Sequence, residues 1–154
     1  MQGNLANAYQ MAGRLEDALS MRQDVYYGKL KLRGEGNGST LVEAYNFATL
    51  FHSLQRFEEA KALLRKTIPL ARRAFGESHE LVLKMRLTYA ATLYENPDAT
   101  LDDFREALAT LEESEQTARR VLGGAHPLAR NIEKALQRAQ RARTALRARE
   151  TPGS

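Results

Sequence analysis

The stretch from Thr40 to Gly76 reads TLVEAYNFATLFHSLQRFEEAKALLRKTIPLARRAFG. Apolar residues recur at helical spacing on both sides of a short break at Gln55-Arg56, which predicts two consecutive helices, the first ending near Leu54. Thr40 and Glu43 form the spacing of a capping box, so the first helix is predicted to start there. Pro69 lies inside the second helix, where we expect a kink rather than an end because the apolar pattern continues beyond it.

The same two-helix unit recurs before and after this stretch. Positions 42 residues apart carry similar apolar residues, namely Leu5, Phe47 and Tyr89, and then Tyr9, Phe51 and Leu93. Ala60 is matched by Ala18 and, after a step of 47, by Ala107. A fixed period with residue types in register is typical of stacked repeats, in which neighbouring units bury each other's apolar faces. We therefore expect these residues to fill the space between paired helices.

The predicted fold is all-α, with about three helix pairs in a superhelix and a C-terminal capping helix. The repeats span about residues 1–38, 39–78 and 79–126, the capping helix spans 127–149, and together they form a single domain over 1–150. Seven helices are expected in total, the first over residues 3–12. A Gly-x-x-His or Gly-x-x-Asn loop closes each unit, at residues 34–37, 76–79 and 123–126. The last residues, 151–154, are predicted to be disordered.

The composition excludes several classes of function. The chain has no cysteine, so disulfides and thiolate metal sites are excluded. Its three histidines form no converging set of ligands, and we predict no metal and no cofactor. We find no Ser-His-Asp arrangement, no phosphate loop and no isolated carboxylate pair, and we predict that the protein is not an enzyme. His79 and His126 are interpreted as capping or loop residues.

The start of the chain and its apolar runs bear on localisation. No apolar run approaches the roughly 20 residues of a membrane span. The chain begins part-way through a repeat, which indicates a fragment, so a targeting segment could be missing. The compartment is not determined by the sequence, and the cytoplasm is favoured.

The positive charge is concentrated at the C-terminal end. From Gly124 to Ser154 there are seven basic residues against two acidic ones, whereas the rest of the chain is nearly neutral. We interpret Arg130, Lys134, Arg138 and Arg141 as a basic surface, on either a solvated capping helix or a site for an acidic protein, membrane surface or nucleic acid. No aromatic residue follows Phe104, which disfavours base stacking and hence nucleic acid.

Several segments together carry a family likeness. The stretches 3–9, 45–51 and 87–93 resemble the first helix of a tetratricopeptide repeat, and 14–18 and 56–60 resemble the start of its second helix. The 42-residue step and the loop Leu122-Gly-Gly-Ala-His-Pro127 resemble the long repeats of kinesin light chains. The likeness covers about residues 3–127.

The resemblance implies a concave groove lined by the leading helix of each repeat. Carried over by position, the groove residues are Asn4, Asn7, Met11, Tyr45, Asn46, Thr49, Ser53, Lys84, Thr88 and Ala91. We therefore predict a protein-interaction module or scaffold that holds a peptide or partner segment in this groove, without a small-molecule substrate. Two alternatives stay open: a subunit packed permanently in a larger complex, and an adaptor that binds an acidic surface through the basic C-terminal helix.

Overall fold

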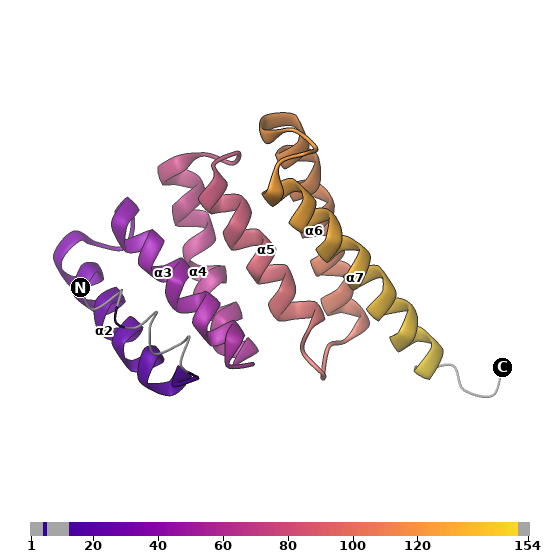
Figure 1. Cartoon of the computed structure of the whole chain (residues 1–154), viewed down its shortest axis with the longest axis horizontal. Helices are drawn as coiled ribbons and strands as arrows, with labels where there is room; N and C mark the ends of the chain where they lie inside the picture. The colour runs from indigo at the N-terminus through magenta and orange to yellow at the C-terminus, as the bar shows by residue number, and fades with distance from the viewer. Residues whose placement is uncertain (1–4, 6–12, 151–154) are drawn as a thin grey trace. The chain divides into compact units, whose positions relative to one another are not determined.

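The computed structural model describes residue 5 and residues 13–150 of the chain. Within these residues the protein is all-helical, with no strand, and its helices are α2 (Leu15–Arg33), α3 (Gly38–Ser53), α4 (Phe57–Phe75), α5 (Glu80–Tyr94), α6 (Leu101–Leu122) and α7 (Pro127–Glu150) (Figure 1). The predicted all-α fold is confirmed. The expected helix at 3–12, apart from the helical residue Leu5, and the expected disorder at 151–154 lie outside the described residues.

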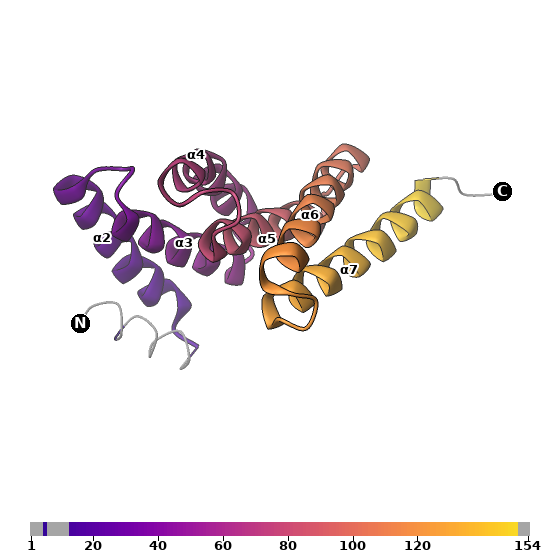
Figure 2. The ribbon, with the colours of Figure 1, turned by 90° about the horizontal axis from the view of Figure 1, so that it is seen from above.

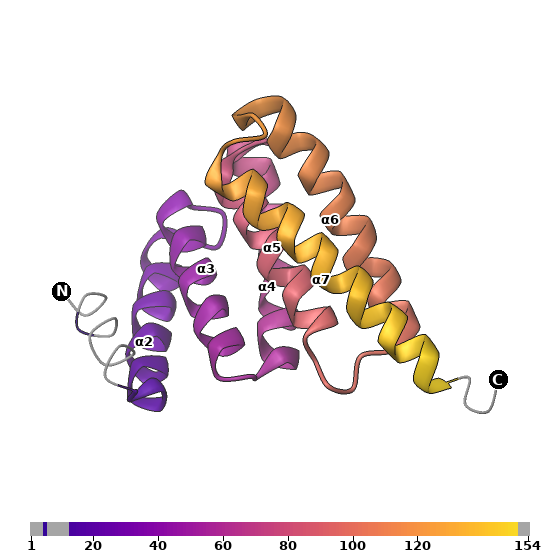
Figure 3. The ribbon, with the colours of Figure 1, turned by 45° about the vertical axis from the view of Figure 1, so that its right-hand side comes forward.

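The helices group into two compact units, one ending at Val82 and the other starting at Leu83. In the first unit α3 packs between α2 and α4, and in the second α7 packs along α6 (Figures 2 and 3). Within each unit, helices adjacent in the chain are therefore neighbours in space, as the repeat pattern predicts. The single domain over residues 1–150 stays a prediction.

The core of the first unit is built from rings and small residues. Phe47 is 4% exposed and its ring centroid lies 4.4 Å from Phe51 and 5.8 Å from Tyr26. Ala48 and Ala60 are fully buried, which lets the helix backbones approach closely. Phe47, Phe51 and Ala60 are thus buried as their 42-residue register predicts.

Helix α4 runs through Pro69 without ending. The proline ring is exposed to solvent, and the neighbouring Thr67 hydroxyl donates to the Leu63 carbonyl at 2.8 Å. The buried stripe of Ala60, Leu64 and Ile68 continues to Ala71, so packing holds both halves of the helix to α3. The prediction that Pro69 does not end the helix is confirmed.

In the second unit, α7 presents one apolar side. Leu128, Ile132, Ala135 and Ala139 are buried, and Leu136 and Leu146 are half-buried. Pro127 is the first residue of α7, where its missing N–H has no helical partner to lose.

Three loops of the same design join each repeat to the next. Each begins with a glycine at positive φ, at Gly34, Gly76 and Gly123, a conformation that L side chains rarely adopt. Each ends with a side chain that accepts a hydrogen bond from the amide two residues on: Asn37 Oδ1 from Ser39 at 2.9 Å, His79 Nδ1 from Leu81 at 3.0 Å and His126 Nδ1 from Leu128 at 3.1 Å. The interpretation of the two histidines as capping residues is confirmed.

Two expectations from the sequence are wrong. Thr40 and Glu43 do not cap α3, because Asn37 is already its N-cap and Gly38 is its first residue. The Thr40 hydroxyl donates to the Lys29 carbonyl instead. Leu5, which the 42-residue register predicts to be buried, is 51% exposed.

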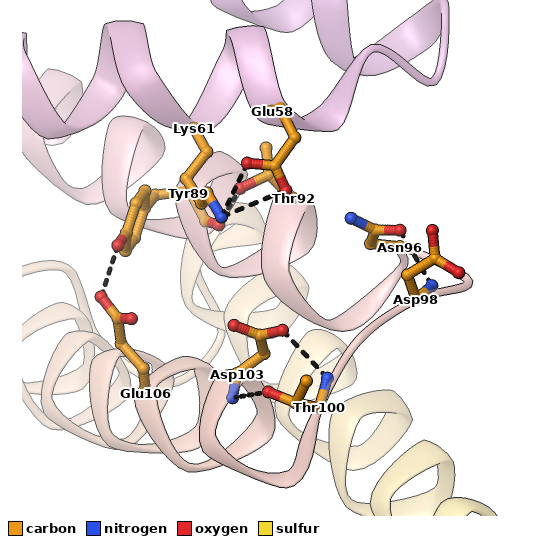
Figure 4. A network of polar contacts seen from close by, with 9 residues as sticks. All are labelled: Glu58, Lys61, Tyr89, Thr92, Asn96, Asp98, Thr100, Asp103 and Glu106. Carbon is orange, nitrogen blue, oxygen red and sulfur yellow. Dashed lines mark hydrogen bonds and ion pairs between the residues drawn. The ribbon is translucent and has the colours of Figure 1, made fainter.

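The breaks within repeats are of two kinds. The two short ones place Gly13 and Gln55 at positive φ, followed by an arginine that pairs with an acid three residues on, in Arg14–Asp17 and Arg56–Glu59. The longer break before α6 ends in a reciprocal cap, in which the Thr100 hydroxyl accepts from the Asp103 amide and the Asp103 carboxylate accepts from the Thr100 amide (Figure 4). Thr100 and Asp103 therefore cap α6.

Candidate functional site

Helix α3 carries a polar stripe on the side that its buried residues leave free. Asn46 and Thr49 are half-buried and Ser53 is exposed, while Val42, one turn before Asn46, is 42% exposed. These positions follow helical spacing and therefore form one face. We name Val42, Asn46, Thr49 and Ser53, with the half-buried Tyr45 beside them, the α3 stripe.

The polar side chains of the α3 stripe differ in how many of their hydrogen-bonding groups already have a partner. Thr49 Oγ1 donates to the Asn46 carbonyl at 2.8 Å, and Ser53 Oγ donates to the Thr49 carbonyl at 3.0 Å. Both hydroxyl oxygens can still accept a bond from another molecule. Among the described residues, the Asn46 side-chain amide makes no hydrogen bond, so it offers a donor and an acceptor together.

The predicted groove residues of the third repeat lie on α5, in the other unit. Lys84 is exposed and Thr88 is half-buried, whereas Ala91 is buried. The remaining predicted groove residues, Asn4, Asn7 and Met11, lie outside the described residues. The structure thus brings Tyr45, Asn46, Thr49 and Ser53 together on α3, and Lys84 and Thr88 together on α5.

The predicted basic surface lies on α7. Arg130, Lys134, Arg138 and Arg141 are all exposed and follow one another at spacings of four, four and three residues. Arg138 lies near the Tyr94 phenol at the end of α5. Burial raises the pKa of Tyr94, the nearby Glu95 raises it further, and Arg138 opposes both.

Charged groups also hold helices together, although the sequence pattern does not predict their pairing. Glu43 on α3 lies 3.6 Å from both Arg22 and Lys29 of α2, and Lys29 Nζ donates to Ser39 Oγ at 2.7 Å. Arg86 on α5 is buried and donates to Glu113 of α6 at 2.6 Å. The sequence does contain a sign of these pairs, namely an arginine or lysine within an otherwise apolar helix face. A protein rarely buries such a side chain without a partner.

Two further features bear on function. Among the described residues, no group of three or more His, Cys, Asp or Glu side chains could hold a metal ion. Within the same residues, none of the helices combines the length and the apolar character that a membrane crossing requires.

Paired helices, a fixed period and the recurring Gly-x-x-Asn/His loop define an α-helical repeat protein. Residues 44–80 match the tetratricopeptide repeat. No curated protein sequence matches the chain.

Solved structures extend the likeness to nearly the whole chain. The nearly identical TPR-like repeats of a kinesin light chain candidate from Podosopora anserina superpose with a TM-score of 0.74 and 23% identity, covering 97% of this chain and 69% of that one. A point variant of the same repeats gives a TM-score of 0.77 and 22% identity, with coverage of 97% and 68%. BtubC (BKLC) from P. vanneervenii superposes with a TM-score of 0.59 and 18% sequence identity, covering 96% of this chain and 63% of that one. The chain therefore has the fold of kinesin light chain-like tetratricopeptide repeats.

This fold supports a role in protein–protein interaction or scaffolding, and its partners are expected to be proteins. Tetratricopeptide repeats are in general protein-interaction modules. His79 and His126 accept hydrogen bonds from helix N-terminal amides, which is a structural role.

Proposed function

We propose that the protein binds a peptide or an extended segment of a partner protein along the α3 stripe. The observation that carries the proposal is the half-buried Asn46 amide, which has no hydrogen-bond partner among the described residues. An amide side chain can donate to a backbone carbonyl and accept from a backbone N–H at once. Asn46 is therefore suited to bind the backbone of an extended peptide, whatever its side chains are.

The surroundings of Asn46 support this assignment. Tyr45 adds a large ring at low cost in side-chain entropy, and Val42 adds exposed apolar area at the same face. The other side of α3 is anchored by Phe47, Leu50 and Phe51, all buried. A stripe on a well-packed helix loses little freedom on binding, which favours affinity.

The proposal is tested by selecting peptides from a displayed random library with the whole chain and measuring their affinity by calorimetry. Asn46→Ala is expected to weaken a selected peptide by about 1–3 kcal/mol, because a peptide group loses its partner in a desolvated contact. Gln23→Ala removes an exposed amide from α2 and serves as the matched control, with no expected change in affinity.

Two results would count against the α3 stripe. One is a selected peptide whose affinity is the same for Asn46→Ala and for the unaltered chain. The other is a failure to select any peptide, which would favour the alternative of a subunit packed permanently against a larger partner. Tyr27 and Leu32 of α2, 52% and 84% exposed, would then be the apolar contacts to test first.

A further inference from the structure

A hollow of about 450 Å³ lies in the second unit, between the end of α5, the start of α6 and the last turns of α7. Tyr94 and Phe104 provide aromatic walls, Ala142 and Ala145 provide the α7 side, and Glu95 and Arg149 are its charged lining residues. Its size falls within the range of ligand-binding clefts. None of the predicted groove residues lines it.

Arg149, which lines the hollow, shares a face of α7 with Arg138. Arg138, Ala142, Ala145 and Arg149 occur at spacings of four, three and four residues and therefore share one face of the helix. The two alanines thus lie between the two arginines. Arg138 and Arg149 are separated along the helix axis by about 16 Å, at 1.5 Å per residue. Arg141, also exposed, flanks the same face.

The charge balance of this region is strongly positive. From Arg138 to Arg149, α7 carries five arginines and no acidic residue. Glu95 is the opposing charge across the hollow. The Arg143 Nε atom is buried without a hydrogen-bond partner, so a donor on this part of α7 is unsatisfied.

The packing of the other helices indicates what kind of element could pack on the end of α7 beside the hollow. Each trailing helix starts with two acidic residues, Glu16 and Asp17 in α2, Glu58 and Glu59 in α4, and Asp102 and Asp103 in α6. In the α3–α4 pair a tight break sets the acidic first turn of α4 directly after the last turn of α3. A helix that packed antiparallel on α7 in this manner would bring its acidic first turn to Arg149.

We propose that the last three turns of α7 and the adjoining hollow form a docking site for an acidic amphipathic helix of a partner protein. Its carboxylates meet Arg138, Arg141 and Arg149, with which arginine forms bidentate pairs. One aliphatic side chain enters the hollow between the two alanines. Small residues at the contact let the two helix axes come within about 8–10 Å.

Other anionic partners fit the site less well. The apolar stripe of α7 is buried against α6, so it is not available to enter a lipid bilayer. A nucleic acid presents phosphates along its whole length, whereas the arginines here flank two alanines. No aromatic side chain lies on α7 itself to stack with a base, and Phe104 in the hollow is buried.

The probe is a synthetic helical peptide of about 20 residues with glutamates at four-residue and three-residue spacing and leucines on the adjoining face. Its Kd is measured by fluorescence anisotropy at 150 mM salt, where the Debye length is about 8 Å. A scrambled peptide of the same composition, a duplex DNA and phosphatidylserine vesicles are measured beside it. We expect the amphipathic peptide to bind at least ten times more tightly than the scrambled one.

The variants separate this site from general charge attraction. Arg141→Glu with Arg149→Glu is expected to weaken binding more than tenfold, and Ala145→Leu, which fills the hollow without changing charge, about tenfold. Arg130→Glu changes an exposed arginine about 16 Å away on the same helix and is expected to change Kd less than twofold. Asn46→Ala should leave Kd unchanged, which separates this site from the α3 stripe.

Several results would overturn the proposal. They are equal binding of the amphipathic and scrambled peptides, an equal loss for the Arg130 and Arg141/Arg149 variants, and tighter binding of DNA or vesicles than of the peptide. Circular dichroism and thermal melting of each variant check that the helices are retained. If Arg141→Glu with Arg149→Glu unfolds the chain, Ala145→Leu decides the question alone.

Discussion

Helices α3 and α5 occupy equivalent places in the repeat, 42 residues apart, yet different side chains stabilise them. Phe47 of α3 and Tyr89 of α5 are 4% and 6% exposed. Phe47 packs among the rings of Tyr26, Tyr27 and Phe51. Tyr89 instead donates its hydroxyl to the Glu106 carboxylate of α6 (Figure 4). The repeat therefore retains burial at this position while its chemistry changes.

The charged contacts of the two helices differ in the same way. Glu43 of α3 has a side chain 13% exposed and lies between two cations of α2. Arg86 of α5 is paired with Glu113, whose side chain is 70% exposed. The ion pairs of Glu43 are thus enclosed by protein, whereas in the Arg86–Glu113 pair the glutamate is exposed to solvent. Substitutions in the two helices test whether this difference governs stability.

The largest effect is expected for Phe47→Ala. Removing a buried ring from an aromatic cluster should lower the free energy of unfolding by about 3–5 kcal/mol. Urea unfolding followed by circular dichroism measures the change. Phe47→Leu keeps most of the volume and should cost less than about 1.5 kcal/mol. A loss below about 1 kcal/mol for the alanine variant, a small part of the usual cost, would show that the cluster relaxes around the gap.

The second effect compares two glutamates. Glu43→Gln removes the anion beside two cations in a mostly buried place and should cost about 2–3 kcal/mol, somewhat below the usual value for a fully buried pair. Glu113→Gln removes an acid exposed to solvent and should cost less than about 1 kcal/mol. Chemical denaturation of both variants gives the two losses. Equal losses would mean that enclosure of the ion pair does not matter here.

The third effect concerns Tyr89→Phe. The ring stays buried and the hydrogen bond to the Glu106 carboxylate is lost, so we expect a loss of about 1.5 kcal/mol in the free energy of unfolding. The double variant with Glu106→Gln should then lose little more than Tyr89→Phe alone, because the two groups act as one pair. Thermal melts of the two single variants and the double variant give the coupling. Strictly additive losses would argue against a shared bond.

The smallest effect concerns the residues that cap the two helices. His79→Ala removes the acceptor of the Leu81 amide at the start of α5 and should cost about 1 kcal/mol. His79→Asn restores the residue found at the equivalent Asn37 and should stay within about 0.5 kcal/mol of the original. Chemical denaturation of the two variants checks the comparison. An asparagine variant as unstable as the alanine one would indicate that stacking of His79 on Phe75, with ring centroids 4.5 Å apart, is the main contribution.

Much of the fold follows from local pattern. The bounds of α4, α5 and α6 agree with the apolar spacing, and the cap of α6 is readable from Thr100 and Asp103. The loops at Gly76 and Gly123 are readable too, because a glycine at positive φ and a capping side chain are both local requirements. Of the candidate site, the grouping of Asn46, Thr49 and Ser53 on one side of α3 follows from the helical period.

Other features depend on residues far apart in the sequence. The sequence by itself determined the repeat period, the helices and the position of most buried residues, because each of these depends on neighbours within a turn or a loop. Only the tertiary structure decided that Glu43 bridges to α2 instead of capping α3, and that α5, α6 and α7 leave a hollow beside Arg149. The physical reason is that a charge partner and a cavity wall are set by how helices pack, which the spacing within any one helix does not specify.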